Sequence, residues 1–129
     1  MFKFFTTLSE EKTKNISPVT LAFVGDAVYT LYVREKLVAE HDFSTGTLQK
    51  LSSSEVSAHG QNILLERILP LLSEDELAVF KRGRNAKKPT RSKNATIAEY
   101  NNSTGFEALL GYLYLTGNYN RIEELLSVE

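Results

Sequence analysis

Apolar residues recur along this chain at the three- and four-residue spacing of amphipathic helices. The segment that begins at Pro18, after the N-cap candidate Ser17, runs without a helix breaker to about Ala39. Ser73 and Glu76 have the spacing of a capping box. The expected helices span residues 18–39, 48–52, 54–68, 73–80, 97–116 or 103–116, and 119–128.

No alternating strand pattern, internal repeat, linker or low-complexity segment interrupts this series of helices. A chain of 129 residues is long enough to bury a core of its own. The sequence therefore predicts an all-α fold in a single domain, residues 1–129, with residues 1–16 as an N-terminal lead-in.

Three features bear on the compartment. The chain has no cysteine, which excludes disulfides and thiolate metal sites and favours a reducing setting. Its first fifteen residues lack the apolar run of a signal peptide. The longest apolar stretch, residues 18–33, is shorter than the roughly 20 residues that span a membrane. We expect a soluble, cytoplasmic protein with no membrane segment.

The net charge of −1 hides an uneven distribution. Residues 81–93 (KRGRNAKKPTRSK) hold seven of the 15 Lys and Arg residues and no acid, whereas the rest of the chain has eight basic residues against 16 acids. Because Gly83, Asn85 and Pro89 interrupt the helical pattern, we expect a loop here. It is either a solvated loop or a loop that follows the phosphate backbone of a polyanion.

The first long helix contains a carboxylate in the stretch LAFVGDAVYTLYV, residues 21–33. Burying an unpaired carboxylate is costly, so Asp26 needs an explanation. A helix that is apolar nearly all round is expected to be buried nearly all round. Either a central helix of the bundle or a helix shared between the core and a second copy of the chain meets that expectation. Gly25, beside the acid, would let another helix approach closely.

A second helix has the same design. In STGFEALLGYLYL, residues 103–115, Glu107 is the lone acid, and Gly111 follows one turn later on the same face. Two such helices could bring Asp26 and Glu107 to one point. One or two carboxylates, completed by water and substrate phosphate, are the usual ligands of Mg²⁺, which can activate a water at a phosphodiester.

Each acid also has a simpler interpretation. Glu107 lies three residues after Thr104 and would close a capping box if the helix began there. Asp26 would be a structural acid if it bonded a neighbouring Tyr or Arg. His41 and His59 are expected to be surface or core residues, because neither has a second His or a carboxylate at ligand spacing.

Three segments, LAFVGDAVYTLYV, KRGRNAK and FEALLGYLYL, occur in this order with no double-stranded-RNA-binding domain after them. In this combination, over residues 17–127, the chain resembles the Mini-ribonuclease III family, the minimal branch of the ribonuclease III superfamily. The resemblance implies an all-α, homodimeric endoribonuclease of the bacterial cytoplasm. It also implies dependence on Mg²⁺ or another divalent cation such as Mn²⁺, and cleavage of double-stranded RNA during maturation of large-subunit ribosomal RNA. A ribosomal-protein helper is compatible with that role.

The resemblance also implies roles for individual residues. Asp26 matches the aspartate of the superfamily signature and Glu107 the glutamate of the C-terminal acidic motif, so both are expected to be catalytic and to bind the metal. Ala22 and Thr104 stand where full-length ribonuclease III enzymes have further carboxylates. The minimal branch shares both departures. The residues expected to contact RNA are Lys81, Arg82, Arg84, Asn85, Lys87 and Lys88.

Two alternative functions are non-catalytic. A non-catalytic RNA-binding or ribosome-associated protein could retain this fold as a scaffold and lose two acids. A helical protein-interaction module would leave the basic segment unexplained. Both remaining acids lie in strongly apolar helices, where a scaffold would gain little from keeping them, and this favours the nuclease.

Overall fold

The computed structural model describes residues 5–88 and 95–128, and over these ranges it is helical, with no strand. This confirms the prediction of an all-α fold. No helix in the described ranges is long and apolar enough to cross a membrane. The helices are α1 (Glu10–Lys14), α2 (Pro18–Glu40), α3 (Thr45–Val56), α4 (Ala58–Ile68), the 3₁₀ turn η1 (Leu69–Leu71), α5 (Glu74–Asn85), α6 (Ile97–Leu115) and α7 (Tyr119–Leu126).

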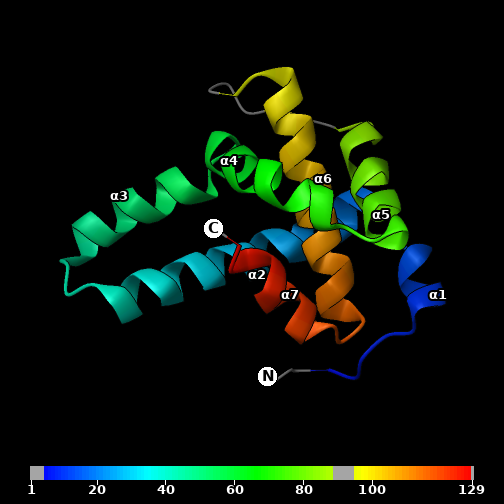
Figure 1. The fold of residues 1–129 in the computed structure, drawn as a ribbon, viewed down its shortest axis with the longest axis horizontal. Coiled ribbons are helices and arrows are strands. Elements are labelled where there is room, and N and C mark those ends of the chain that lie inside the picture. The colour runs from blue at the N-terminus through cyan, green and yellow to red at the C-terminus, as the bar shows by residue number, and fades with distance from the viewer. Residues whose placement is uncertain (1–4, 89–94, 129) are drawn as a thin grey trace.

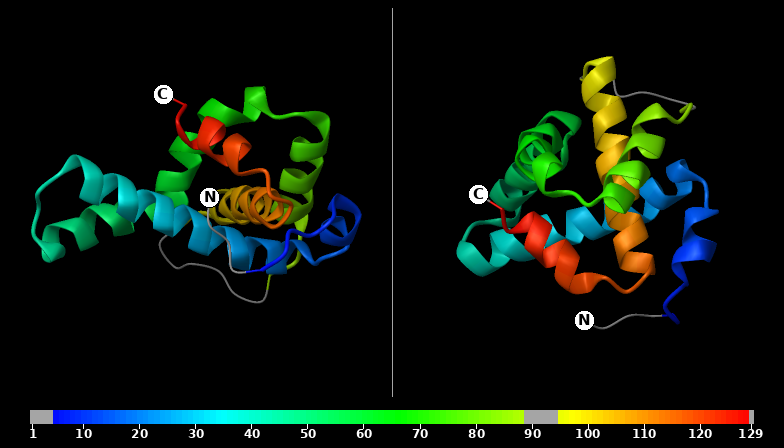
Figure 2. Two further views of the ribbon diagram at one scale, coloured as in Figure 1. Left: turned by 90° about the horizontal axis from the view of Figure 1, so that it is seen from below. Right: turned by 45° about the vertical axis from the view of Figure 1, so that its right-hand side comes forward.

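Helix α6 is the centre of the fold (Figure 1). In Figure 2, left, α6 is seen nearly end-on with α2, α4, α5 and α7 arranged around it. Its residues Phe106, Ala108, Leu109 and Leu110 are fully buried. They pack in one apolar core with side chains from the surrounding helices. Because α6 is covered on several sides, its apolar residues occur all round the helix.

Helix α2 buries only one face. Its buried positions recur every three or four residues: Leu21, Ala22, Gly25, Tyr29, Val33 and Leu37. On the other side Phe23 is 79% exposed, Leu31 61% and Val38 65%. The expectation that α2 is buried nearly all round is therefore wrong for the single chain. The alternative arrangement, with the core on one face and a second copy on the other, is compatible with this exposed apolar surface.

Two helix crossings depend on glycine. At the α2–α6 crossing, a Cβ on Gly25 would come within 1.7 Å of the Glu107 carbonyl oxygen, and one on Gly111 within 2.0 Å of the Leu21 carbonyl oxygen. At the α5–α6 crossing, a Cβ on Gly83 would lie 2.9 Å from the Cα of Gly105. The helix backbones approach too closely at these points for any side chain. The close approach expected beside Asp26 is confirmed.

Side-chain N-caps begin most of the described helices. The predicted capping box of Ser73 and Glu76 begins α5, and Thr96 and Glu99 form another at the start of α6. Helix α6 therefore has the longer of its two expected spans. Thr104 lies inside it, and the interpretation of Glu107 as a capping-box residue is wrong. Ser57 caps α4, so the break between α3 and α4 falls later than the sequence pattern indicated.

The lead-in contains a helix that the sequence analysis did not predict. Ser9 accepts a hydrogen bond from the Lys12 amide and begins α1, and Glu10 and Glu11 lie in the first turn. Such acids favour a helix N-terminus. The signal was therefore present in the sequence, in the Ser-Glu-Glu order.

The basic segment begins on a helix. Helix α5 continues through Lys81, Arg82 and Arg84 to Asn85, so the prediction of a loop is wrong for residues 81–85. Gly83 does not end the helix, because it makes the close contact with α6. Residues 86–88 follow without regular structure, and residues 89–94 lie outside the described ranges. Three acids in the first turn of α5 and basic residues in the last complement the helix dipole.

Candidate functional site

The α2–α6 crossing brings Asp26 and Glu107 together. Gly25 lies against the backbone of Glu107, so the next residue of α2, Asp26, is placed beside the Glu107 side chain. The two carboxyl groups interact, and the Asp26 charge raises the pKa of Glu107. Two residues 81 positions apart in the sequence thus form one acidic pair, as the sequence analysis expected.

The two acids differ in burial. Asp26 is exposed in this chain, whereas Glu107 is half-buried. The premise that Asp26 is a costly buried acid is therefore wrong, because position 26 lies just off the buried face of α2. In the described ranges no Lys, Arg or His forms an ion pair with either carboxylate. The alternative of a structural Asp26 bonded to an arginine is not supported.

Glu107 is the acid with unusual chemistry. Burial raises the pKa of Glu107 to about 8, the hydrogen bond from Gln61 opposes that shift, and the neighbouring Asp26 charge adds to it. In the absence of a cation, the carboxyl is therefore held in its protonated form near neutral pH. A cation beside both acids would favour the ionised form instead.

Gln61 is a part of this site that the sequence analysis missed. Its Nε2 atom donates to Glu107 Oε2 at 3.1 Å and to the Val56 carbonyl oxygen at 3.0 Å. The residue is 2% exposed, in line with Leu65 and Ile68 on the buried face of α4. An amide at a position whose helical neighbours are apolar was the available signal.

Ala22 and Thr104, where the superfamily has carboxylates, offer no ligand to an ion at this site. Ala22 is buried in the core. Thr104 is also buried, and its hydroxyl donates to the Tyr100 carbonyl oxygen at 3.1 Å, within α6. The acidic pair therefore consists of Asp26 and Glu107 alone.

The basic end of α5 lies against α6, close to the stretch of that helix that carries Glu107. Gly83 contacts Thr104, Gly105 and Ala108, within one turn of Glu107. The exposed residues here are Lys81, Arg82, Asn85 and Lys87, with Arg84 and Lys88 half-buried. Basic side chains thus flank the helix that carries Glu107.

Several of these side chains already have partners in the chain. Arg82 donates to the Lys14 carbonyl oxygen at 2.9 Å, and the Arg84 guanidinium lies 5.7 Å from the centre of the Phe80 ring. Lys88 Nζ donates to the Arg84 and Ala86 carbonyl oxygens, and burial lowers the pKa of this lysine. Lys81 and Lys87 are the more freely exposed lysines of the group.

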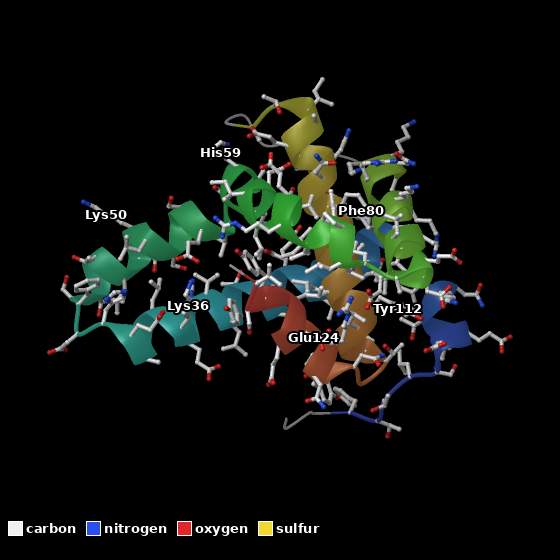
Figure 3. All side chains as sticks on the ribbon, viewed as in Figure 1. Lys36, Lys50, His59, Phe80, Tyr112 and Glu124 are labelled. Carbon is white, nitrogen blue, oxygen red and sulfur yellow. The ribbon has the colours of Figure 1, made fainter. Side chains whose placement is uncertain are left out.

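The two histidines do not belong to the acidic pair. His41 stacks on Phe43 at the end of α2. His59, at the start of α4, lies 2.6 Å from Glu99 Oε2 and helps to lower the pKa of that carboxyl (Figure 3). Both are surface residues, as expected.

The donor set matches a hard divalent cation. Asp26 and Glu107 offer carboxylate oxygens that pair with no cationic side chain in the described part of the chain, and such oxygens suit Mg²⁺ or Mn²⁺ better than a softer metal. Within residues 5–88 and 95–128, no group of three or more His, Cys, Asp or Glu side chains gathers at one place. An ion held here would keep several ligand positions for water or phosphate, as Mg²⁺ commonly does.

Comparisons with known proteins agree with the resemblance. A family model described as the ribonuclease III domain matches residues 19–118. A Mini-ribonuclease 3 from Thermoanaerobacter sp. (strain X514) is 44% identical over 94% of this chain and 85% of its own length. One from Brevibacillus brevis is 45% identical, over 91% of this chain and 90% of its own.

A solved structure shows the same fold. The crystal structure of a Fusobacterium nucleatum protein superposes with a TM-score of 0.81 and 28% sequence identity, covering 92% of this chain and 93% of that one. The matches to the family and to the named ribonucleases cover nearly the whole chain, and they support an enzyme over the two non-catalytic alternatives. The chain belongs to the ribonuclease III family, in its Mini-ribonuclease 3 branch, and is an endoribonuclease.

Proposed function

We propose that this endoribonuclease depends on a divalent cation, Mg²⁺ or Mn²⁺, that Asp26 and Glu107 bind together. The observation that carries the proposal is the acidic pair itself, two adjacent carboxyl groups with no cationic side chain among residues 5–88 and 95–128 to balance them. Like charges at short distance are unfavourable unless a proton or a cation is shared between them.

The two acids have different tasks. A bound Mg²⁺ supplies an activated water and neutralises charge at the scissile phosphate. Asp26, which is exposed, is accessible to an ion and a phosphate from solvent. Glu107 must release its proton when the ion binds, since burial and Asp26 keep its pKa near 8. No side chain of the chain is needed as the nucleophile.

The proposed substrate is double-stranded RNA. Lys81, Arg82, Arg84, Asn85, Lys87 and Lys88 are proposed to contact its backbone, with Asn85 as a partner for a 2′-hydroxyl. The contact of Gly83, on the same helix, with α6 within one turn of Glu107 supports this, because it brings the basic end of α5 near the acidic pair. Duplex RNA presents its shape, phosphates and 2′-hydroxyls more than its base edges, so selection by structure is expected.

The proposed assembly is a homodimer through the exposed face of α2. Phe23, Leu31 and Val38 on this helix are exposed in the single chain, and a second copy of the same face would cover them. The proposed setting is the bacterial cytoplasm, and the proposed RNA is a precursor of large-subunit ribosomal RNA. A ribosomal protein bound to that precursor is proposed as a helper.

The test compares one RNA sequence in two forms. The purified protein is incubated with a duplex and with its separate strands, in Mg²⁺ or in EDTA, and the products are resolved on a denaturing gel. Cleavage of the duplex alone, and only in Mg²⁺, is expected. Cleavage that persists in EDTA, or equal cleavage of single strands, would contradict the proposal. A parallel incubation with large-subunit precursor RNA, free or with ribosomal proteins, tests the substrate and the helper.

A further inference from the structure

Gln61 occupies an unusual position for an amide side chain. It is 2% exposed, on the buried face of α4, and its Oε1 atom has no hydrogen-bond partner in the described part of the chain. A buried polar atom without a partner lowers stability, so an apolar side chain would suit this position better if packing were its only task. The hydrogen bonds that the Nε2 end of the amide donates explain its presence better than packing does.

The donor end of Gln61 is fully used. Nε2 bonds the Val56 carbonyl oxygen and Glu107 Oε2. Val56 is the last residue of α3, where helical carbonyls have no partner in their own helix. A carbonyl oxygen can only accept, so it fixes which end of the amide faces this way. With that orientation fixed, the second hydrogen of Nε2 points at Glu107.

The hydrogen bond from Gln61 restrains the Glu107 carboxylate but leaves most of its acceptor positions available. A carboxylate has two oxygens and about four acceptor positions, and Gln61 uses one of them, on Oε2. The glutamate side chain is flexible, and ordering it for an ion costs conformational entropy. Because Gln61 is anchored at the end of α3, it holds the Glu107 carboxyl in place before any ion arrives.

We propose that Gln61 is a positioning residue for the cation site, which holds the Glu107 carboxylate in the orientation that faces Asp26 and so strengthens binding of the divalent ion. This inference rests on the proposed role of Asp26 and Glu107. Gln61 acts on the ion through Glu107, as hydrogen-bond partners of metal ligands commonly do. It also couples the α3–α4 junction to the site on α6.

The test variant is Gln61→Met, which keeps length and volume but removes the donor. Binding of Mn²⁺ to the RNA-free protein is followed by the loss of the free-ion electron paramagnetic resonance signal. We expect the Mn²⁺ dissociation constant to rise about 10-fold, the lower end of the effect seen when such partners are removed. The melting temperature in EDTA should change little, because loss of the buried unpaired Oε1 atom offsets loss of the hydrogen bond to the Val56 carbonyl oxygen.

Asn62→Leu is the matched control. Asn62 is the next residue of α4, and its Nδ2 donates to the Glu99 carbonyl oxygen at 3.0 Å, so it also bridges α4 to α6 without contacting Glu107. Its removal should leave Mn²⁺ binding within about twofold of the wild type. An equal loss of Mn²⁺ binding in Asn62→Leu and Gln61→Met would overturn the proposal, because the loss of any hydrogen bond between α4 and α6 would then weaken the site.

A double mutant separates a direct effect from one through Glu107. In the Glu107→Gln background, Gln61→Met should weaken Mn²⁺ binding no further. Additive losses would overturn the proposal. Gln61→Asn, which keeps an amide too short to span both acceptors, is expected to weaken binding as Gln61→Met does. If both single variants fail to fold, Gln61 is a structural residue and the proposal is wrong.

The wild-type protein decides whether the proposed function or the positioning role has failed. Wild-type protein that binds no Mn²⁺ and cleaves duplex RNA in EDTA would overturn the proposed function, and this inference with it. Wild-type binding that Gln61→Met leaves unchanged would overturn the positioning role alone. The Mn²⁺ concentration that gives half-maximal single-turnover cleavage should rise in the same proportion as the dissociation constant.

Discussion

Gly25 lies so close to Glu107 that a Cβ at position 25 would come within 1.7 Å of the Glu107 carbonyl oxygen. This contact fixes the point along α6 at which α2 crosses it, and it places Asp26 beside the Glu107 carboxyl. Gly25 and Asp26 thus act together. Gly25 allows α2 and α6 to approach closely, and this approach brings the Asp26 side chain next to Glu107.

Gly25→Ala is therefore expected to separate α2 from α6 and to lower the free energy of unfolding by at least about 1–3 kcal/mol, the cost of overpacking. Chemical denaturation measures the change. Gly46→Ala is the control, because a Cβ at position 46 of α3 meets nothing within 4 Å. Alanine should be neutral there or stabilise the helix by up to about 1 kcal/mol. Equal stability of Gly25→Ala and wild type would refute the tight crossing.

The exposed side of α2 gives a prediction about assembly. Phe23→Glu places a charge on the apolar face proposed to meet a second copy, and it should convert a dimer to a monomer in sedimentation experiments. Ile97→Glu, at an exposed apolar position on the first turn of α6, should leave the dimer intact. A wild-type protein that sediments as a monomer at micromolar concentration would refute the proposed dimer.

Local sequence signals predicted much of the fold. Pro18 began α2, and the capping box of Ser73 began α5 at the expected place, because helix starts depend on a few neighbouring residues. The end of α5 was mispredicted, since Gly83 indicates a helix break by local preference. The contact of Gly83 with Gly105 on α6 favours continuation of the helix, and the local sequence does not indicate that contact.

The candidate site divides in the same way. Asp26 and Glu107 were identified because each is a lone acid near a glycine in an apolar helix, and the structure brings the two together. The burial expected for Asp26 was wrong, since it depends on which face of α2 meets the core. Gln61 was missed because its role depends on a contact with Glu107, 46 positions away in the sequence, which no local pattern around α4 indicates.

The basic end of α5 should contribute to RNA binding. Replacing Lys81 and Lys87 by alanine should weaken duplex binding and reduce its salt slope by about one unit or less for each phosphate that the variant no longer neutralises. Folding should be little changed, because both side chains are exposed. Filter binding over a range of salt concentrations measures both effects.

Lys36→Ala combined with Lys50→Ala is the control for that pair. It removes the same charge from the arm formed by α2 and α3, away from Phe80 and the end of α5 (Figure 3). The control should change the salt slope much less. If the two double variants behave alike, the basic residues of α5 act only through net charge.

The pKa of Glu107 predicts how stability depends on pH without a divalent cation. Since burial and Asp26 raise this pKa to about 8, the folded chain holds a proton that the unfolded chain releases near pH 4.5. The free energy of unfolding should therefore fall as pH rises from about 4.5 to about 8, by at most about 1.4 kcal/mol per pH unit, and level off above. Melting in EDTA at a series of pH values measures this, and Glu107→Gln should flatten the curve over that range.

Asp26→Asn tests the central claim, that the acidic pair holds the catalytic cation. The change keeps shape and removes charge. Single-turnover cleavage of duplex RNA in Mg²⁺ should therefore fall at least about 100-fold, more than the loss of a residue that only positions a ligand. Duplex binding should persist, and the melting temperature in EDTA should hold or rise, because a carboxyl beside Glu107 no longer carries charge. An Asp26→Asn protein that cleaves at the wild-type rate, or that melts far below the wild type, would contradict the account.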